Sequence, residues 1–184
     1  MGNQLVLDVG CGKHKVEGAI GLDRTLLAGV DVVADIESIL PFCDNCFSLL
    51  YANHVLEHVT NLAHVLSEFE RVCCPGAVIN IVVPYFSCVG AFGDPTHVRF
   101  FTYYTFDFFS DNSARDPERY TWFSSTRFHI RRRRIGFGRL FRMLGIEWWA
   151  NHFPYIYEGF LPYILPARTL IVELIVVKSD ATQR

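Results

Sequence analysis

Residues 5–12 constrain the fold of this chain more than any other segment. Residues 5–9 are apolar except for Asp8, and apolar and polar residues do not alternate. This pattern predicts a β-strand that is covered on both faces. Gly10 and Gly12 follow directly, and glycine permits a sharp turn and a close approach of the backbone to a ligand. Such a strand and turn predict the start of an open α/β sheet, in which ligands bind beyond the carboxyl ends of the strands.

A second strand-like run, residues 19–23, ends in the acid Asp23. A dinucleotide site would need a third glycine and an acid about twenty residues further on. Here Gly12 is followed by Lys-His-Lys, and the distance to Asp23 is too short for a full crossover helix. The spacing therefore disfavours a nicotinamide enzyme and leaves a D-x-G-x-G turn followed by an acid.

These two segments resemble motifs I and II of the class I S-adenosylmethionine-dependent methyltransferases, in their type 11-like group. Other segments similar to that family follow in the family's order: residues 32–36, 40–42, 47–59 and 74–84. Residues 94–99 and 157–160 fit a subgroup with a shortened first crossover. The resemblance covers most of residues 4–110 and, more loosely, residues 155–178. One departure is His14, which stands where the family commonly has a glycine.

The resemblance implies a Rossmann-like α/β fold, with a seven-stranded, mostly parallel sheet, helices on both faces and a final antiparallel strand. Strands are expected near residues 4–9, 19–23, 30–35, 47–52, 77–83, 126–134 and 169–177. Apolar residues at helical spacing predict a helix between Thr60 and Cys73, capped by Thr60 and ended by Pro75-Gly76. We expect one domain, residues 1–184, to which residues 85–165 contribute substrate-side insertions.

The composition indicates in which compartment the protein works and which kinds of partner it binds. The net charge of −2 argues against a nucleic-acid binder, and no apolar run reaches the length of a membrane span. We therefore expect a cytoplasmic protein that acts on a small molecule. The six cysteines fit free thiols. Cys43 and Cys46 form a C-x-x-C pair, but no second pair accompanies it, so a zinc site there is disfavoured.

The resemblance implies S-adenosylmethionine as the cofactor and places its site at the strand ends. Asp23 would accept both ribose hydroxyls, and Asp35 with the Ile36 backbone would meet the adenine edge. The backbone of Gly10, Cys11 and Gly12 suits the methionine portion. The remaining cofactor contacts are expected from Asp8, which orders the loop or binds the amine through water, and from Asn53 and His54. The alternative for each acid is a solvated loop carboxylate.

A hydroxyl acceptor would need a base, and histidine is the usual one near neutral pH. We predict His97 as base or substrate ligand, with His58 as the second catalytic candidate; the alternative for His97 is a purely structural histidine. A metal ion bridging His54, His58 and His97 is conceivable, but without an H-E-x-x-H motif none is predicted. Substrate contacts are predicted for Arg99, Tyr104 and Tyr157.

Four consecutive arginines occupy residues 131–134. Strand alternation would place Arg131 and Arg133 on one face and Arg132 and Arg134 on the other. One interpretation is that they hold an anionic substrate group. The favoured interpretation is that their charge prevents an edge strand from pairing with other chains.

Together these features predict a methyltransferase with a small acidic, lipidic or glycosidic acceptor. The alternative is a catalytically degenerate module of the same fold that binds the cofactor or a partner protein.

Overall fold

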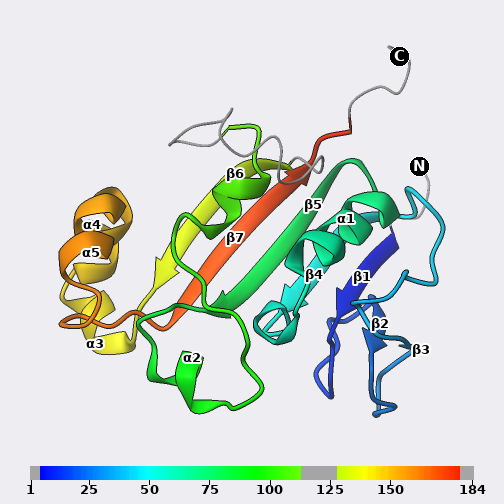
Figure 1. Cartoon of the computed structure of the whole chain (residues 1–184), viewed down its shortest axis with the longest axis horizontal. Coiled ribbons are helices and arrows are strands. Elements are labelled where there is room, and N and C mark those ends of the chain that lie inside the picture. Colours follow the sequence, from blue (N-terminus) through cyan, green and yellow to red (C-terminus); the bar gives the residue numbers. More distant parts are fainter. Residues whose placement is uncertain (1–4, 113–127, 179–184) are drawn as a thin grey trace.

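The computed structural model describes residues 5–112 and 128–178, and a single seven-stranded sheet runs through them (Figure 1). The strand order is β3-β2-β1-β4-β5-β7-β6. The strands are β1 (Leu5–Val9), β2 (Ile20–Asp23), β3 (Val32–Val33), β4 (Phe47–Asn53), β5 (Cys73–Pro84), β6 (Phe128–Gly136) and β7 (Thr169–Val176). The seven predicted strands are therefore confirmed, although residues 126–127 of the sixth lie outside the described residues.

Strands β1 to β5 pair in parallel, while β7 pairs antiparallel with both β5 and β6. The predicted final antiparallel strand is thus confirmed. Because β1, β2, β3 and β4 run in the same direction, the loops that follow them meet at one edge of the sheet. This edge carries the acids that the sequence placed at strand ends.

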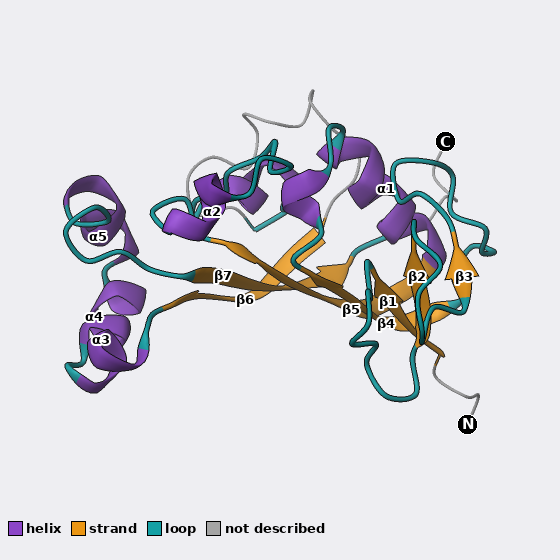
Figure 2. Ribbon diagram, turned by 90° about the horizontal axis from the view of Figure 1, so that it is seen from below, coloured by secondary structure: helices purple, strands orange, loops and turns teal. Residues whose placement is uncertain are grey.

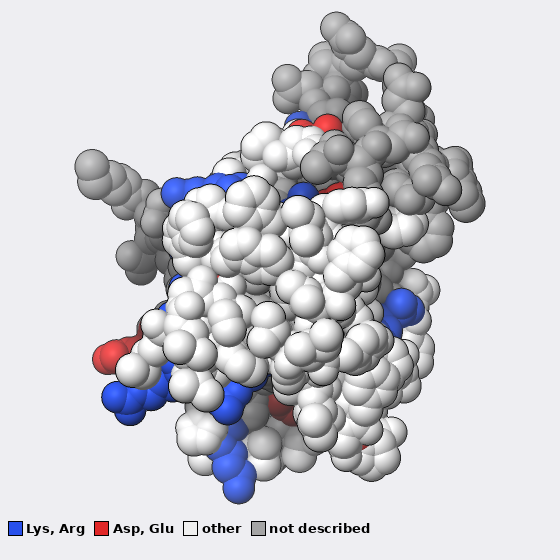
Figure 3. Space-filling view, turned by 90° about the vertical axis from the view of Figure 1, so that its left-hand side faces the viewer, with Lys and Arg blue, Asp and Glu red and all other residues white. Residues whose placement is uncertain are grey.

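The helices are short and unevenly distributed. They are η1 (Leu56–His58), α1 (Leu62–Val72), α2 (Val89–Gly93), η2 (Thr105–Phe109), α3 (Arg139–Met143), α4 (Ile146–His152) and α5 (Pro154–Phe160). Helices α1 and α2 lie on one face of the sheet, and α3 to α5 gather beyond the ends of β6 and β7 (Figure 2). The surface over this end of the molecule is broad and mostly uncharged (Figure 3).

The burial of strand side chains agrees with helices that lie mainly on one face of the sheet. In β7 the residues Leu170, Val172, Leu174 and Val176 are buried, and those between them are only half-buried. The buried set belongs to the same hydrophobic cluster as Val65, Leu66, Phe69 and Val72 of α1, which repeat at helical spacing and are fully buried. Among the described residues, helices cover the second face of the sheet less completely than predicted (Figure 2).

Two details of α1 differ from the prediction. The N-cap is Asn61, whose side chain accepts a hydrogen bond from the His64 amide at 3.1 Å. Thr60 lies one residue earlier, where its amide and hydroxyl donate to Glu37 at 2.8 and 2.6 Å. The helix ends at Val72, and Pro75-Gly76 belongs to β5. The strand begins early because Cys73 pairs with Phe47 of β4, an interaction between strands that helical spacing cannot reveal.

The expectation of six free thiols is wrong for one pair, because Cys43 and Cys46 form a disulfide in the loop before β4. The spacing of two residues lets the loop bring their α-carbons to 5.9 Å. Cys11, Cys73, Cys74 and Cys88 are free thiols, as predicted. Within the described residues, no helix is long and apolar enough to cross a membrane.

Candidate functional site

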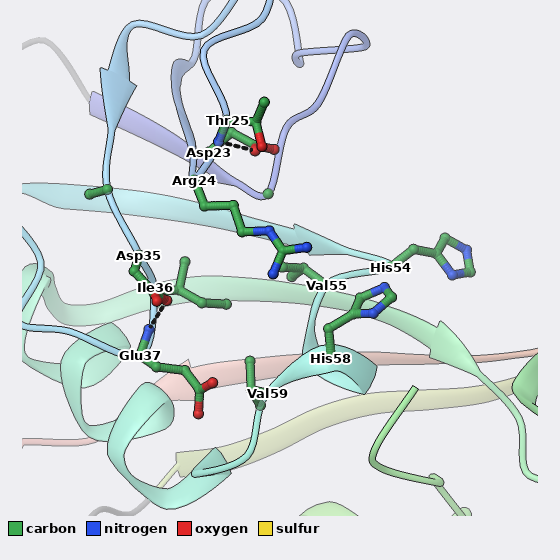
Figure 4. A pocket seen from close by; sticks show the side chains of 12 residues that line it. Asp23, Arg24, Thr25, Asp35, Ile36, Glu37, His54, Val55, His58 and Val59 are labelled. Atoms are coloured by element: carbon green, nitrogen blue, oxygen red, sulfur yellow. Dashed lines mark hydrogen bonds between the residues drawn. The ribbon is translucent and has the colours of Figure 1, made fainter. Parts of the chain in front are cut away.

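A cavity of about 330 Å³ opens at the edge where β1, β2, β3 and β4 end (Figure 4). Its walls come from the loops that follow these strands and from η1. The lining residues are Gly10, Asp23, Arg24, Thr25, Ala34, Asp35, Ile36, Glu37, His54, Val55, His58 and Val59. Six of them (Gly10, Asp23, Asp35, Ile36, His54 and His58) are predicted site residues.

The glycine turn after β1 forms one wall of the cavity. Gly10 has a φ of +64°, and a Cβ added to it would lie 2.6 Å from Cγ2 of Val55. Only glycine fits this position without displacing the neighbouring wall. The Gly10 and Cys11 amides both donate to the carbonyl oxygen of Leu22, at 2.8 and 3.2 Å. The loop amides expected to bind the methionine portion therefore already have partners on β2.

Asp23 lies at the end of β2 and lines the cavity. Its two carboxylate oxygens accept hydrogen bonds from the amides of Gly12 at 3.0 Å and Thr25 at 2.9 Å. A carboxylate has about four acceptor sites, so two remain for hydroxyl donors from a ligand. The predicted ribose contact is compatible with this geometry.

The adenine-side residues also line the cavity. Asp35 accepts a hydrogen bond from the Glu37 amide at 2.9 Å, which fixes the turn after β3 and exposes Ile36 to the cavity. Asp8, by contrast, is buried beneath the loop and accepts from the Val16 amide at 2.8 Å. Burial raises the pKa of Asp8. Asp8 was predicted either to order the loop or to bind the cofactor's amine through water, and the structure shows that it orders the loop.

His54 follows β4 and has a φ of +54°, which is uncommon for a residue with a side chain. Its Nδ1 lies 3.3 Å from Oε1 of Glu57, and this acid raises the pKa of His54. His54 lines the cavity, whereas its neighbour Asn53 is exposed and does not line it.

His58 and His97 come together although 39 positions separate them (97 − 58). Their ring centroids are 4.7 Å apart in an edge-to-face arrangement. The carbonyl oxygen of Glu57 accepts hydrogen bonds from the amides of Val98 and Arg99, at 2.9 and 3.1 Å, and so attaches the loop that carries His97 to η1. His58 lines the cavity, and His97 packs against His58 without lining the cavity itself.

The three predicted substrate residues differ in burial and in the groups that they contact. Arg99 donates from Nε to the carbonyl oxygen of Val59 at 2.8 Å and from Nη2 to that of Thr60. Tyr157 is fully buried, and its hydroxyl donates to the carbonyl oxygen of Leu165 at 2.8 Å. Tyr104 is half-buried, with the Arg133 guanidinium 5.8 Å from its ring centre. None of the three lines the cavity.

The arginine run forms part of an edge strand, as the favoured interpretation held. A bulge between Ile130 and Arg132 breaks the expected alternation, so Arg131 and Arg132 both lie 4.0 Å from Glu173. Arg133 points to the covered face and lies 2.5 Å from the buried carboxylate of Asp107. Arg134 pairs with Glu147 of α4. The predicted alternation of these four side chains is therefore wrong at Arg131.

Several residues of the site escaped the sequence argument. Arg24 and Val55 each follow a predicted residue directly, and Thr25 comes next after Arg24, so their proximity could have been inferred from the strand ends. Glu57 is the more important omission, because it is 1 % exposed and contacts His54. The i, i+3 spacing of His54 and Glu57 was the available signal.

Comparison with known proteins agrees with this geometry. Residues 16–81 match the methyltransferase domain family. This part of the chain is therefore similar to the methyltransferase domain family. The resemblance in the sequence and the predicted fold class are thereby confirmed, and S-adenosylmethionine is the cofactor of this family. No match to a curated protein sequence was found.

Solved structures share the fold of this chain. A SAM-dependent methyltransferase from Archaeoglobus fulgidus aligns with a TM-score of 0.60 at 17% identity over 95% of this chain and 86% of that one. An S-adenosylmethionine-dependent methyltransferase from Mesorhizobium loti gives 0.53 at 14% identity, over 95% and 91%. The [4+2]-cyclase SpnF gives 0.55 at 19% identity, over 97% and 77%. At these identities the likeness concerns the fold alone.

The cavity fits the cofactor of the family. Its volume of about 330 Å³ lies within the range of small-molecule sites, about 300–1,000 Å³. Asp23 retains free acceptor positions for hydroxyl donors, and Gly10 lines the cavity at a position where a side chain would collide with Val55. The donor set of carboxylates and backbone groups suits a nucleoside with a cationic sulfonium.

Proposed function

We propose that this protein transfers a methyl group from S-adenosylmethionine to a small-molecule acceptor. The proposal rests on the cavity and its two acids. Asp23 ends β2, Asp35 follows the neighbouring strand β3, and both line the cavity. Acids in these positions suit ribose hydroxyls and the adenine edge. When bound, the cofactor supplies an electrophilic methyl group on a positively charged sulfur.

The chain's own residues hold and orient the ligand. Asp23 accepts the ribose hydroxyls, Asp35 and the Ile36 backbone meet the adenine, and the open surface of Gly10 admits the methionine portion. Cys11 and Gly12 shape the same turn, and Asp8 holds it through Val16. His54 lies at the methionine end, with Asn53 beside it. Methyl transfer depends mainly on the alignment of two reacting atoms, so a rigid turn of this kind favours the reaction.

The acceptor side of the site is formed by His58 and His97. His58 lines the cavity and His97 packs against it, so their ring nitrogens could meet a polar acceptor, either to remove its proton or to bind it. We place the acceptor over this edge and assign residues 85–165 to its surroundings, because the loop with His97 belongs to that segment. Arg99 and Tyr104 would hold the segments that surround the acceptor without lining the cavity. Tyr157 is buried and would stabilise the same segments by packing in the core.

Cofactor binding is the first test. Isothermal titration of the purified protein with S-adenosylhomocysteine is expected to show one site per chain, with NAD as a negative control. A second measurement follows S-adenosylhomocysteine release from S-adenosylmethionine in the presence of pools of phenols, sugars and acidic metabolites. His97→Gln is expected to abolish that release while cofactor affinity stays nearly unchanged. Absence of binding at millimolar ligand would refute the proposal.

A second candidate function is cofactor binding without methyl transfer. One observation favours it: the amides of Gly10, Cys11 and Gly12 already have partners, so the loop offers the cofactor fewer free donors than predicted. The same assays separate the two candidates, since tight binding with no methylated product from any acceptor pool supports the second.

A further inference from the structure

Glu57 has a feature that the proposed reaction leaves unexplained. The residue is 1 % exposed, its Oε1 lies 3.3 Å from Nδ1 of His54, and its Oε2 is buried without a hydrogen-bond donor among the described residues. A buried carboxylate oxygen without a donor is costly and calls for an explanation, of which a bound ion is one. One ligand atom of Glu57 lies within 4.8 Å of one from His58 and one from His97.

The hydrogen bonds around His97 determine which of its nitrogens is available. Nδ1 lies 3.0 Å from the carbonyl oxygen of Ala91, and a carbonyl oxygen only accepts, so Nδ1 carries the hydrogen. In the neutral ring this leaves Nε2 with a lone pair. Oδ2 of Asp94 lies 3.8 Å from this Nε2.

The same reasoning applies to His58 through Thr96. The Thr96 hydroxyl donates to Asp94 at 2.6 Å, so it accepts from Nδ1 of His58 at 2.9 Å. The carbonyl oxygen of Thr96 lies 3.3 Å from the same nitrogen. Nδ1 of His58 therefore carries the hydrogen, and its Nε2 also has a free lone pair. Histidines that bind metals usually donate their other N–H to a carbonyl or carboxylate in this way.

We propose that Glu57, His58 and His97 form a binding site for a divalent transition-metal ion at the edge of the cofactor cavity. Two imidazoles and one carboxylate suit zinc or iron, and such sets leave coordination positions open. Bonds of about 2.0–2.2 Å imply ligand atoms about 3.4 Å apart, so the cluster closes on the ion by small side-chain rotations. The ion also supplies the positive partner that the Glu57 oxygen lacks.

The site gives the acceptor a more specific chemistry, and this part rests on the proposed function. His58 belongs to the metal cluster and also lines the cavity. An acceptor oxygen bound to the ion would therefore lie beside the cofactor. A bound divalent ion lowers the pKa of a hydroxyl, whose proton then leaves to solvent near neutral pH. The acceptor class is therefore an oxygen nucleophile, such as a phenol or a hydroxy acid. In this state the ion takes the place of the imidazole base.

Metal binding is tested on the protein without cofactor or acceptor. After chelation and gel filtration, titration with Zn²⁺ is expected to give one site per chain, with Mg²⁺ binding much more weakly. His97→Gln and His58→Gln should each weaken Zn²⁺ binding about tenfold or more. His129→Gln is the matched control, because this exposed histidine lies on β6, outside the cluster. Co²⁺ absorption spectra provide a second readout of nitrogen ligation.

The outcomes separate this inference from the proposed function. Zn²⁺ affinity that is unchanged in both histidine variants, or no Zn²⁺ site at all, overturns the metal site even when S-adenosylhomocysteine still binds. Loss of Zn²⁺ binding with retained S-adenosylhomocysteine affinity supports the site and shows that the variants are folded. Glu57→Gln is a third variant; because it removes a buried charge, its thermal unfolding is measured alongside.

Discussion

The backbone amide of Gly12 donates a 3.0 Å hydrogen bond to the carboxylate of Asp23. The acid at the end of β2 thereby holds the turn that follows β1. This bond joins the two sequence motifs that the family resemblance first paired, and it brings both to one wall of the cavity. In a sheet with a shortened first crossover, the acid both supports the loop and lines the cavity.

Asp23→Asn is expected to weaken S-adenosylhomocysteine binding by about 1.5–3 kcal/mol, roughly 10- to 150-fold, because charge-assisted hydrogen bonds to the ribose are lost. Isothermal titration measures the change. Asp31→Asn is the control, since Asp31 also supports this region, through Gly21 and Lys15, but does not line the cavity. Equal losses in the two variants would indicate a disturbed loop rather than a lost ligand contact.

Gly10→Ala is expected to lower both cofactor affinity and stability. The added Cβ would lie 2.6 Å from Val55 Cγ2, and the φ of +64° costs a side chain about 1–2 kcal/mol. The double variant with Val55→Ala should recover part of the loss, because it removes the contacted methyl groups. Thermal unfolding and titration are the measurements. Gly159→Ala serves as control, since its Cβ would meet nothing within 4 Å; a similar loss there would contradict the argument.

Arg133→Met is expected to destabilise the protein by about 3–5 kcal/mol, since it leaves the buried carboxylate of Asp107 without its cation. Urea denaturation measures the change. Arg131→Met should alter the free energy of unfolding by less than about 0.5 kcal/mol, because that side chain is 59% exposed and 4.0 Å from Glu173. Comparable effects at the two positions would show that the edge strand uses all its arginines alike.

The pair formed by Glu68 and Arg71 predicts a pH dependence of stability. Arg71 donates to Glu68 from Nε and Nη2, at 2.9 and 2.8 Å, and holds the pKa of Glu68 below its ordinary value. Since the folded pKa is the lower one, the stabilisation is complete above the unfolded pKa of about 4.3 and is lost as the pH falls through the folded pKa.

Glu68→Gln should therefore be less stable than the wild type at pH 7, by about 1.5–3 kcal/mol for charge-assisted hydrogen bonds. The difference should shrink steadily below about pH 4. Urea denaturation at several pH values compares the two proteins. A difference that stays constant from neutral to acidic pH would show that the carboxylate's charge is not responsible.

Local sequence patterns were sufficient for the strands and for five of the predicted cofactor residues, which line the cavity, whereas Asp8, Cys11, Gly12 and Asn53 do not line it. Apolar runs specify strands through burial, and Asp23, Asp35 and Gly10 stand directly at strand ends, so their positions follow from the strands. Helix limits were less accessible, because the pairing of Cys73 with β4 ends α1 earlier than the glycine signal suggested.

The amino-acid sequence by itself determined where the strands lie along the chain and which acids follow them, because both depend on patterns within a few residues. Only the tertiary structure decided that Glu57, His58 and His97 meet, since this requires the loop after α2 to bind the Glu57 carbonyl oxygen. It also decided that the loop amides donate to Leu22 and that Arg133 turns toward Asp107. These features depend on partners distant in the chain, whose approach is set by packing.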